Sequence, residues 1–453
     1  MPPRLVFHYA ELMPSTPSGP KSHASRGHHR GNRRARSHAA AHADPPSLTP
    51  AIDHPLVPSC EPELLTDSGE INALCDHIVQ EGRVGFDTEF IGETSYYPRL
   101  CLIQVATSSR LVILDPLSDL DVLPFWKTLN NPDVVTIVHA GGQDLEPIPR
   151  LTGDLPGRIF DTQIAAGMSG HPYPASLSHL LKQIAGVKIS KGFTFTDWEE
   201  RPLSDMQKGY AADDVRYLIL LHDLLEKALE ASGHTAWAME EFCSISDATA
   251  KAFDPTNQCR RILKNRTMKA RPRRILESIV QARNIAAEHH DLPPRTLLPD
   301  QVVLEMVRKS PTTTDELHRL KGMPRPTAQR FGEPLLAAME EGRDASLSGS
   351  DRLESRDERP DERLMIDGLW ATLSAWCLGR GLAPQLVTNR TNVGQWYLQS
   401  RGDGEPQGSL ATGWRAEMMA ESAIPLLRGD ATMALQWRDH RVHAAMTPPT
   451  NDD

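Results

Sequence analysis

Two carboxylates in one short segment have the spacing of a metal site. In GFDTEF, Asp87 and Glu89 are two residues apart. The apolar neighbours of this pair predict a β-strand. Because side chains alternate along a strand, both carboxylates are expected on one face. Adjacent carboxylates repel each other, and a hard divalent cation with oxygen ligands is the usual way to neutralise them. An exposed pair on an edge strand is the alternative interpretation of the segment alone.

A third carboxylate follows a second predicted strand. The segment VVTIVHAGGQDLEPI predicts a strand that ends at His139, a tight turn at two glycines and a helix opened by Asp144. Functional groups often collect in such strand-end turns. The alternative is that Asp144 only accepts hydrogen bonds from the first amides of its helix. His139 is expected to be a hydrogen-bonded strand-end residue, and Pro147 and Pro149 are expected to shorten or distort the helix.

A tyrosine and a fourth carboxylate share one face of a predicted helix. Ser204 and Gln207 form the capping-box pattern that begins a helix. Tyr210 and Asp214 are four residues apart, so they lie one above the other. Asp213 points about 100° away from them and is expected to be solvated. In isolation, a tyrosine and an aspartate on a helix indicate packing and surface.

The elements that must position these side chains form an α/β region. A helix is predicted over Asp67–Glu81, ended by Gly82, and a short helix over 162–168. Longer helices are predicted over 176–186 and 204–231, and most of the later chain has a helical period. The predicted strands are Val84–Phe90, Leu100–Thr107, Leu111–Asp115 and Val134–His139. Together they predict a mixed sheet packed between helices. No convincing strand follows residue 240, and the last twenty or so residues look frayed.

Five segments, taken in order, resemble a known nuclease family. GFDTEF, YYPRLCLIQV, HAGGQDLE, DTQIAA and TDWEERPLSDMQKGYAADDVRYL resemble the ribonuclease D branch of the DEDD 3′–5′ exonucleases over about residues 61–235. The resemblance implies an α/β ribonuclease-H-like (DnaQ-like) exonuclease domain with a mixed sheet, followed by all-α HRDC-type helical domains. The tyrosine four residues before the last aspartate is similar to that of the Tyr-containing subtype.

The resemblance also implies a catalytic site and its cofactors. It implies that Asp87, Glu89, Asp144 and Asp214 bind two divalent metal ions, Mg²⁺ or Mn²⁺, and that Tyr210 orients the attacking water. In the family pattern, Asp87 bridges the ions, Glu89 and Asp214 complete the water-activating site, and Asp144 supports the other site. Two ions about 4 Å apart can activate a water and stabilise the departing 3′-oxygen. An unperturbed tyrosine pKa near 10 means that Tyr210 could act as a base only if a metal lowered that pKa.

The uneven distribution of charge points to a polyanionic partner. The net charge of −10 combines a net of −17 over residues 51–250 with +6 over 251–345. The segment CRRILKNRTMKARPRR, residues 259–274, carries eight basic and no acidic side chains, which favours a polyphosphate. A solvated Arg-rich linker is the alternative. The region 268–345 resembles the HRDC domain, a small nucleic-acid-binding module. Its basic candidates for phosphate contact are Arg273, Arg274, Arg283, Arg308, Lys309, Lys321 and Arg325.

The chain divides into five predicted parts. These are a disordered basic tail over 1–58, the exonuclease domain over 59–240, the HRDC domain over 268–345, a linker over 346–361 and a second HRDC-like helical domain over 362–432. The acidic balance of the last part indicates packing, or shaping of a ring-like entrance, more than phosphate binding. Its tryptophans are expected to form helical core rather than to stack on bases: Trp370, Trp376, Trp396 and Trp414.

These observations predict a cytoplasmic, metal-dependent 3′–5′ exoribonuclease. It would release nucleoside 5′-monophosphates from RNA 3′ ends, with tRNA precursors as the substrate that the resemblance implies. We expect a monomer with no membrane partner and no small-molecule cofactor. Six scattered cysteines, without zinc-site spacing, are expected to be reduced thiols. The alternatives are a DNA exonuclease of the same chemistry, or an RNA-binding scaffold in which a displaced Asp144 leaves the site short of a metal.

Overall fold

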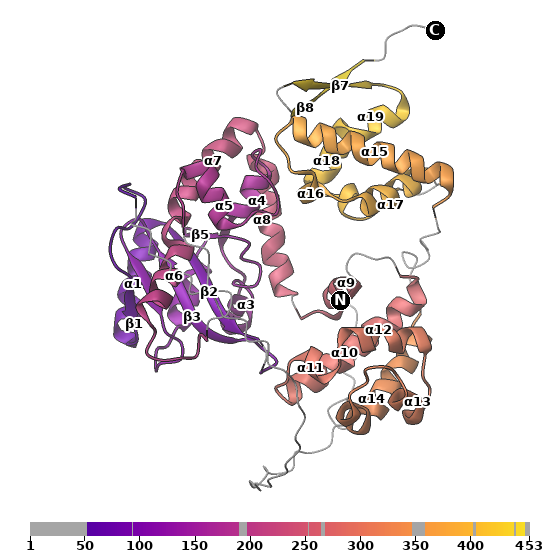
Figure 1. Ribbon diagram of the computed structural model, residues 1–453, viewed down its shortest axis with the longest axis horizontal. Coiled ribbons are helices and arrows are strands. Elements are labelled where there is room, and N and C mark those ends of the chain that lie inside the picture. The colour runs from indigo at the N-terminus through magenta and orange to yellow at the C-terminus, as the bar shows by residue number, and fades with distance from the viewer. Residues whose placement is uncertain are drawn as a thin grey trace, which may run out of the picture.

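The computed structural model describes residues 52–92, 94–189, 197–251, 253–263, 268–346, 358–401, 405–438 and 441–448 (Figure 1). The predicted basic tail lies outside the described residues up to residue 51, and the predicted linker lies outside them over 347–357. None of the helices in the described ranges is long and apolar enough to cross a membrane.

A six-stranded mixed sheet forms the centre of the N-terminal half. Its strands are β1 (Glu63–Leu65), β2 (Arg83–Ile91), β3 (Arg99–Ala106), β4 (Leu111–Leu114), β5 (Val135–Val138) and β6 (Arg158–Asp161). The order across the sheet is β1-β4-β3-β2-β5-β6. β3 is antiparallel to both of its neighbours and the other pairs are parallel. The four predicted strands are present to within one residue at each end. β1 and β6 were not predicted, because Glu63 begins the first and Arg158 and Asp161 flank the second, so neither is a run of apolar and β-branched residues as β4 and β5 are.

Helices cover both faces of this sheet. α1 (Ser68–Glu81) begins where the Asp67 side chain accepts from the amide of Gly69 and ends at Gly82, whose φ is 68°, as the sequence predicts. α2 (Leu123–Thr128) packs beside α1 and contributes Phe125 and Trp126, which meet Phe86 of β2 edge to face with ring centroids 6.0 Å apart. One face of β2 is therefore an aromatic core.

The opposite face of β2 lies under α6 (Asp205–Arg216) and α7 (Leu218–Ser232). A Cβ on Gly85 would lie 2.8 Å from the Cβ of Leu218, so glycine permits the close approach of α7 to the strand. The predicted capping box at Ser204 is present. The prediction of one continuous helix over 204–231 was wrong, because Tyr217 interrupts it with a φ of −103° and a ψ of 1°.

Asp213 is buried, so the prediction that it is solvated was wrong. Its side chain lies 3.5 Å from the guanidinium of Arg216. Arg216 in turn donates to the carbonyl oxygens of Pro58 and Cys60, at 2.6 and 3.2 Å. The segment ahead of β1 thus covers this side of α6. A helical wheel could not reveal this, because the covering residues lie more than 150 positions away in sequence.

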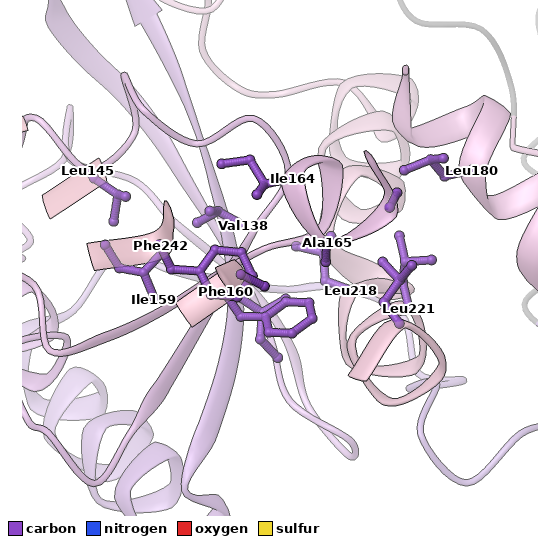
Figure 2. Close-up of a cluster of buried hydrophobic side chains, with 14 of the residues drawn as sticks. Val138, Leu145, Ile159, Phe160, Ile164, Ala165, Leu180, Leu218, Leu221 and Phe242 are labelled. Carbon is purple, nitrogen blue, oxygen red and sulfur yellow. The ribbon is translucent and has the colours of Figure 1, made fainter. Parts of the chain in front are cut away.

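The remaining helices of this half enclose a second part of the core. They are α3 (Pro147–Thr152), α4 (Thr162–Gly167), α5 (Leu177–Leu180) with a π-helical turn at Leu181–Ala185, and α8 (Thr235–Ala250). Figure 2 shows Val138 of β5 and Phe160 of β6 beside Ile164, Leu218 and Phe242 from the surrounding helices. This packing fixes the ends of β5 and β6 against α4, α7 and α8.

A first group of helices has its own hydrophobic core. It comprises α9 (Pro255–Leu263), α10 (Ala270–His289), α11 (Pro294–Leu297), α12 (Asp300–Lys309), α13 (Thr314–His318) and α14 (Arg325–Asp344). This group meets the sheet domain at the loop between β2 and β3. There the Tyr96 amide donates to Asp291 and the Tyr97 hydroxyl to Glu288, each at 3.0 Å, and both rings pack on Phe253.

A second group of helices shares the core of the sheet domain. It comprises α15 (Pro360–Gly379), α16 (Pro384–Val387), α17 (Arg390–Ser400), α18 (Gly413–Glu421) and α19 (Ala423–Arg428). Trp376, Trp396 and Trp414 are buried in the same hydrophobic cluster as the sheet residues, in agreement with the predicted helical-core role. In Figure 1 both groups lie to the right of the sheet domain, this one above and the first below.

The chain after α19 forms a two-stranded hairpin, so the prediction of no later strand and a frayed end was wrong. β7 (Thr432–Arg438) and β8 (Arg441–Thr447) pair antiparallel, and β8 packs on α15. The close contact is at Gly379, where an added Cβ would lie 3.2 Å from the amide of Ala444. The strands contain several alanines and few β-branched residues, which gives weak strand propensity. Tertiary packing on α15 compensates for that weakness.

Candidate active site

Asp87 and Glu89 lie on a central strand. β2 pairs with β3 on one side and with β5 on the other, which removes the edge-strand alternative. The two residues have the same parity as Gly85, so their side chains project toward the face under α6 and α7. A register irregularity follows Glu89 at the end of the pair.

Asp144 lies in a turn, so the prediction that it opens a helix was wrong. α3 begins three residues later, at Pro147, which lacks the amide hydrogen that an earlier helical turn would use. The carboxylate is fixed by the neighbouring strand, because the Thr88 hydroxyl of β2 donates a short hydrogen bond to it. The shortened helix therefore leaves Asp144 beside Asp87.

The turn that carries Asp144 is itself held by a buried carboxylate. Asp161, at the end of β6, accepts hydrogen bonds from the amides of Ala140 and Gly141, at 3.1 and 3.2 Å. A Cβ on Gly141 would lie 2.4 Å from the Cβ of Val138, so this position requires glycine. His139, as expected, is hydrogen-bonded at both ring nitrogens, and burial lowers its pKa to about 4.

Tyr210 and Asp214 lie one helical turn apart on α6, above β2. Burial raises the pKa of Asp214, and the neighbouring Tyr210 side chain opposes that rise. The Tyr210 ring stacks on Trp198 with centroids 6.1 Å apart. The structure thus brings together residues from β2, from the turn after β5 and from α6.

The four carboxylates form one electrostatic cluster. Burial, followed by repulsion from the neighbouring carboxylates, raises the pKa of Asp87 well above its usual range and that of Glu89 to about 8. Burial also raises the pKa of Asp214 to about 7 and, in direction, that of Asp144. Burial and the charge of Asp214 raise the pKa of Tyr210, so its hydroxyl stays protonated at neutral pH. This supports a hydrogen-bonding role for Tyr210 over that of a base.

The donor set fits a hard divalent cation. In the ranges that the structure describes, no group of three or more His, Cys, Asp or Glu side chains is arranged to hold a metal ion. After burial, the charges of Asp144, Asp214 and Glu89 raise the pKa of Asp87, and the charge of Asp144 also raises the pKa of Glu89 and of Asp214. An oxygen-coordinated divalent ion is the group that relieves such repulsion.

The stability of the metal-free protein is expected to fall as pH rises. The pKa values of Glu89 and Asp214 in the folded protein, about 8 and about 7, exceed the ordinary values of 4.5 and 3.8. Between about pH 6.5 and 8 these groups make the folded protein bind more protons than the unfolded chain, so the free energy of unfolding decreases with pH. Below that range the lowered pKa values of the buried His139 and His222 act in the opposite direction. Thermal unfolding between pH 5 and 8.5, with chelator or with Mn²⁺, measures this.

Metal and an uncharged side chain should each reduce that pH dependence. Mn²⁺ should raise the melting temperature most at the alkaline end, because fewer protons must then be displaced. Glu89→Gln, which cannot ionise, should flatten the profile of the metal-free protein. An identical pH slope with and without metal would contradict the cluster.

Sequence inspection missed several residues around this site. Thr88 and Asp161 hold the turn of Asp144, while Trp198 packs on Tyr210 and Arg201 holds the backbone of Trp198. All four fall inside the segments that carry the family resemblance, but their contacts are long-range, so their roles could not be assigned from spacing.

The predicted phosphate-binding residues divide into buried and exposed sets. Arg283 is buried, donates to Asp300 at 2.7 Å and holds the carbonyl oxygen of Leu298, so its predicted availability to phosphate was wrong. Arg273 and Arg274 pair with Glu277. Arg308 pairs with Glu305, and the exposed candidates also include Lys309, Lys321 and Arg325.

The basic segment also approaches the carboxylate cluster. Arg261 of α9 lies 3.6 Å from Glu146, which is two residues beyond Asp144. Arg260 and Arg261 are both exposed, whereas Cys259 and Ile262 of the same helix are buried. α9 therefore presents one cation, Arg261, beside the turn of Asp144 and a second exposed cation, Arg260, at the preceding position of the helix.

Comparisons with known proteins agree with this arrangement. Residues 62–230 match a family model described as 3′–5′ exonuclease, and residues 273–339 match the HRDC domain. Ribonuclease D of Granulibacter bethesdensis is 32% identical over 379 residues, covering 83% of this chain and 94% of that protein. Ribonuclease D of Gluconacetobacter diazotrophicus is 32% identical over 372 residues, covering 82% and 93%.

A solved structure extends the match to most of the chain. The crystal structure of Escherichia coli RNase D, described as an exoribonuclease involved in structured RNA processing, superposes with a TM-score of 0.66 at 26% identity. It covers 82% of this chain and 99% of its own. The chain thus belongs to the ribonuclease D family and is a hydrolytic 3′–5′ exoribonuclease that has a DnaQ-like domain, acts on RNA and depends on divalent metal.

Proposed function

We propose that Asp87, Glu89, Asp144 and Asp214 hold two divalent ions, Mg²⁺ or Mn²⁺, and that Tyr210 completes the catalytic site. The observation that carries this proposal is that four buried carboxylates from three separate parts of the fold come together, so that Asp87 feels the charges of the other three. Bound ions would activate a water and stabilise the leaving 3′-oxygen.

The protein side chains would supply orientation at this site. The protonated Tyr210 hydroxyl, beside Asp214 and with its ring stacked on Trp198, is suited to orient a water against the scissile phosphate. The Thr88 hydroxyl holds Asp144 on the far side of the cluster. RNA 3′ ends would then be shortened by one nucleoside 5′-monophosphate at a time.

We further propose 3′ maturation of tRNA precursors, by a cytoplasmic monomer without a small-molecule cofactor. The relatives named ribonuclease D support an RNA-processing role, and the Escherichia coli protein is described as processing structured RNA. In the proposed division, the domain over 59–240 cleaves and the HRDC domain over 268–345 holds the RNA body. The part over 362–432 packs on the catalytic domain.

A 3′-shortening assay tests the proposed site. A 5′-labelled RNA with a structured body and a single-stranded 3′ tail is incubated with wild type or Asp214→Ala, with Mg²⁺, Mn²⁺ or chelator. The expected result is a metal-dependent ladder that is absent in the variant and blocked by a 3′-phosphate. Binding of the RNA without a ladder in either metal would instead support a binding scaffold, and an equal ladder on matched DNA would support a DNA exonuclease.

Arg260 and Arg261 are expected to contribute to RNA binding without contributing to the chemical step. Changing both to glutamine should weaken RNA binding and reduce the slope of log Kd against log salt by about 0.7 for each phosphate that the variant no longer neutralises. The rate at saturating RNA should stay within about twofold. Filter binding at several salt concentrations measures the slope. Arg428→Gln, on an exposed arginine of the second helical group, is the matched control; an unchanged slope in the double variant would refute the role.

A further inference from the structure

The loop between β2 and β3 buries an aromatic side chain in a domain other than its own. Tyr96 follows a strand of the catalytic domain, yet it is 6% exposed and lies in the hydrophobic core of the first group of helices, α9 to α14. Its ring packs on that of Phe253 with centroids 5.3 Å apart. Its amide donates to the side chain of Asp291, just after α10, at 3.0 Å. The loop is therefore docked into the helical group.

Tyr97 joins three segments at the same place. Its hydroxyl donates to Glu288 of α10 at 3.0 Å, and its ring packs edge to face on Phe253 with centroids 5.0 Å apart. The guanidinium of Arg150, on α3, lies 4.5 Å from the centre of the Tyr97 ring, which is a cation–π contact. One side chain thus connects the loop after β2, the helix after the turn of Asp144 and the first group of helices.

The elements that meet at this contact also carry proposed metal ligands. β2, which carries Glu89, runs into the loop, and α3, which carries Arg150, follows the turn of Asp144. A further contact joins α9 to that turn, because Arg261 lies 3.6 Å from Glu146. The first group of helices is therefore attached to the catalytic domain beside the carboxylate cluster.

The two groups of helices are held to the catalytic domain in different ways. The second group shares one hydrophobic cluster with the sheet, which includes the buried Trp376 and Trp414. The first group has a separate cluster, to which the loop after β2 contributes Tyr96. A domain with its own core and a small interface is expected to move relative to its neighbour unless a specific contact fixes it. The orientation of the first group therefore depends on this loop.

Apolar packing alone does not account for the contact. A phenylalanine would fill the space of Tyr97 but would not donate to Glu288. Asp291 adopts a φ of 47°, in the left-handed region that aspartate tolerates better than most residues, and its carboxylate accepts from the amide of Tyr96. Apolar contact is non-directional, whereas hydrogen bonds have a preferred geometry. The two bonds thus fix an orientation as well as a contact.

We propose that Tyr96 and Tyr97 form an interdomain latch, which holds the first group of helices in one orientation so that the 3′ end of RNA bound to these helices enters the carboxylate cluster. This inference rests on the proposed function, because it assigns cleavage to the cluster and RNA holding to the HRDC domain. The latch serves RNA that contacts both domains at once. An RNA that reaches only the cluster does not need it.

Tyr97→Ala tests the latch and leaves the buried Tyr96 in place. The change removes the ring contacts with Phe253 and Arg150 and the hydrogen bond to Glu288. Cleavage is compared on a 5′-labelled RNA hairpin with a single-stranded 3′ tail and on an RNA of about four nucleotides, which is too short to be held at two sites. For the hairpin, kcat/KM should fall at least about tenfold, because the 3′ end loses its high effective concentration at the cluster. For the short RNA it should stay within about twofold of wild type.

The two substrates separate the outcomes of this test. An unchanged kcat/KM for the hairpin would overturn the latch. Equal losses on both RNAs would also overturn it, because Tyr97 would then act on the carboxylate site itself. If the wild type cleaves neither RNA, the proposed function has failed, which is a different result. Small-angle X-ray scattering without RNA gives a readout besides activity: the radius of gyration should increase in Tyr97→Ala, and an unchanged value would contradict release of the helices.

Trp237→Ala is the matched control, because Trp237 makes the same kind of contact with the second group of helices. Its indole donates to Glu417 of α18 at 2.9 Å, and its ring stacks on that of Trp414 with centroids 5.4 Å apart. Since the second group shares the core of the sheet domain, loss of one side chain should not release it. The ratio of kcat/KM between the two RNAs should therefore stay within about twofold of wild type.

A double-mutant cycle tests the hydrogen bond from Tyr97 to Glu288. Tyr97→Phe keeps the ring and loses the donor, and Glu288→Ala removes the acceptor. Each single change should lower kcat/KM for the hairpin by about three- to tenfold, the range of a hydrogen bond to a partly solvated charged group. The double variant should lose little more than the larger single effect. Fully additive losses would show that the two side chains act independently and would overturn their pairing in the latch.

Discussion

Replacing Asp87 by asparagine is expected to reduce the rate of RNA cleavage by more than about a thousandfold. A single preorganised electrostatic group is worth about 100- to 1,000-fold in kcat, and Asp87 lies at the centre of the cluster, where it feels all three other carboxylates. Asparagine preserves the shape of the side chain, so the dissociation constant for RNA should change little. Single-turnover cleavage in saturating Mn²⁺ measures the rate, and filter binding measures the affinity.

The same substitution is expected to stabilise the metal-free protein. The pKa of Asp87 is raised by burial first and then by the charges of Asp144, Asp214 and Glu89, so its ionised form is unfavourable in the folded state. Removing that charge should raise the melting temperature measured in chelator above pH 7. The further rise in melting temperature that Mn²⁺ causes in the wild type should disappear. Asp223→Asn, on a surface residue paired with Lys227, should do neither. Cleavage by Asp87→Asn at the wild-type rate would refute the site assignment.

Replacing Trp414 by alanine is expected to lower the free energy of unfolding by about 3–5 kcal/mol, the usual cost of truncating a buried large aromatic side chain. Trp414 is 1% exposed and lies in the cluster that also contains the sheet domain. Its indole and amide donate to Glu241 and Glu240 of α8, at 2.9 and 3.0 Å. Arg415 beside it makes two further bonds to Glu241, at 2.7 and 3.0 Å.

Urea unfolding, followed by circular dichroism, measures the loss. Trp437→Ala is the matched control, because Trp437 is 71% exposed on β7 and its removal should cost less than about 0.5 kcal/mol. Equal effects of the two substitutions would show that the second helical group is not built into the catalytic core. Because of this packing, a truncated chain without residues 268–453 would have part of its hydrophobic core exposed. Charge substitutions in the full chain are therefore the better test of whether the helical groups bind RNA.

Local rules recovered much of the fold from the sequence. The helix after Asp67 ends at Gly82 because a left-handed residue is needed there, and Ser204 with Gln207 begins α6 by a contact within one turn. Strand alternation put Asp87 and Glu89 on one face, and helical spacing put Tyr210 above Asp214. These patterns depend only on residues a few positions apart, which is why one sequence is enough to find them.

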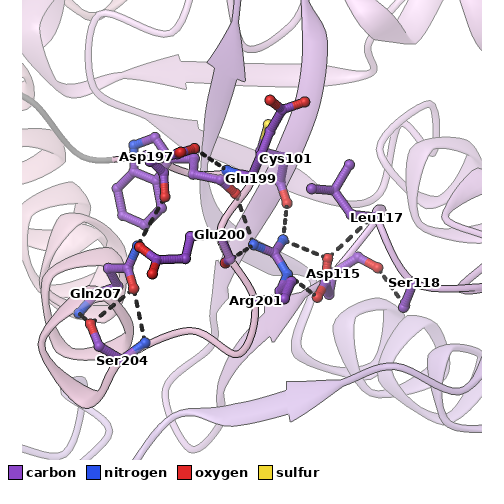
Figure 3. A network of polar contacts seen from close by, with 11 residues as sticks. Cys101, Asp115, Leu117, Ser118, Asp197, Glu199, Glu200, Arg201, Ser204 and Gln207 are labelled. Carbon is purple, nitrogen blue, oxygen red and sulfur yellow. Dashed lines mark hydrogen bonds and ion pairs between the residues drawn. The ribbon is translucent and has the colours of Figure 1, made fainter.

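The tertiary structure decided which of these side chains are buried and what they contact. The position of Asp213 on its helix predicted exposure to solvent, but the segment near Pro58 covers it. Arg283 lies in a basic region that predicted phosphate contact, but it is buried and paired with Asp300. The hairpin at the end of the chain has weak strand propensity and forms on α15. The order of the motifs along the sequence identified the family and predicted the four carboxylates as metal ligands. Their repulsion, and the ion pair of Arg201 with the buried Asp115 (Figure 3), arise only when distant segments meet, because burial and electrostatic coupling depend on distance in space.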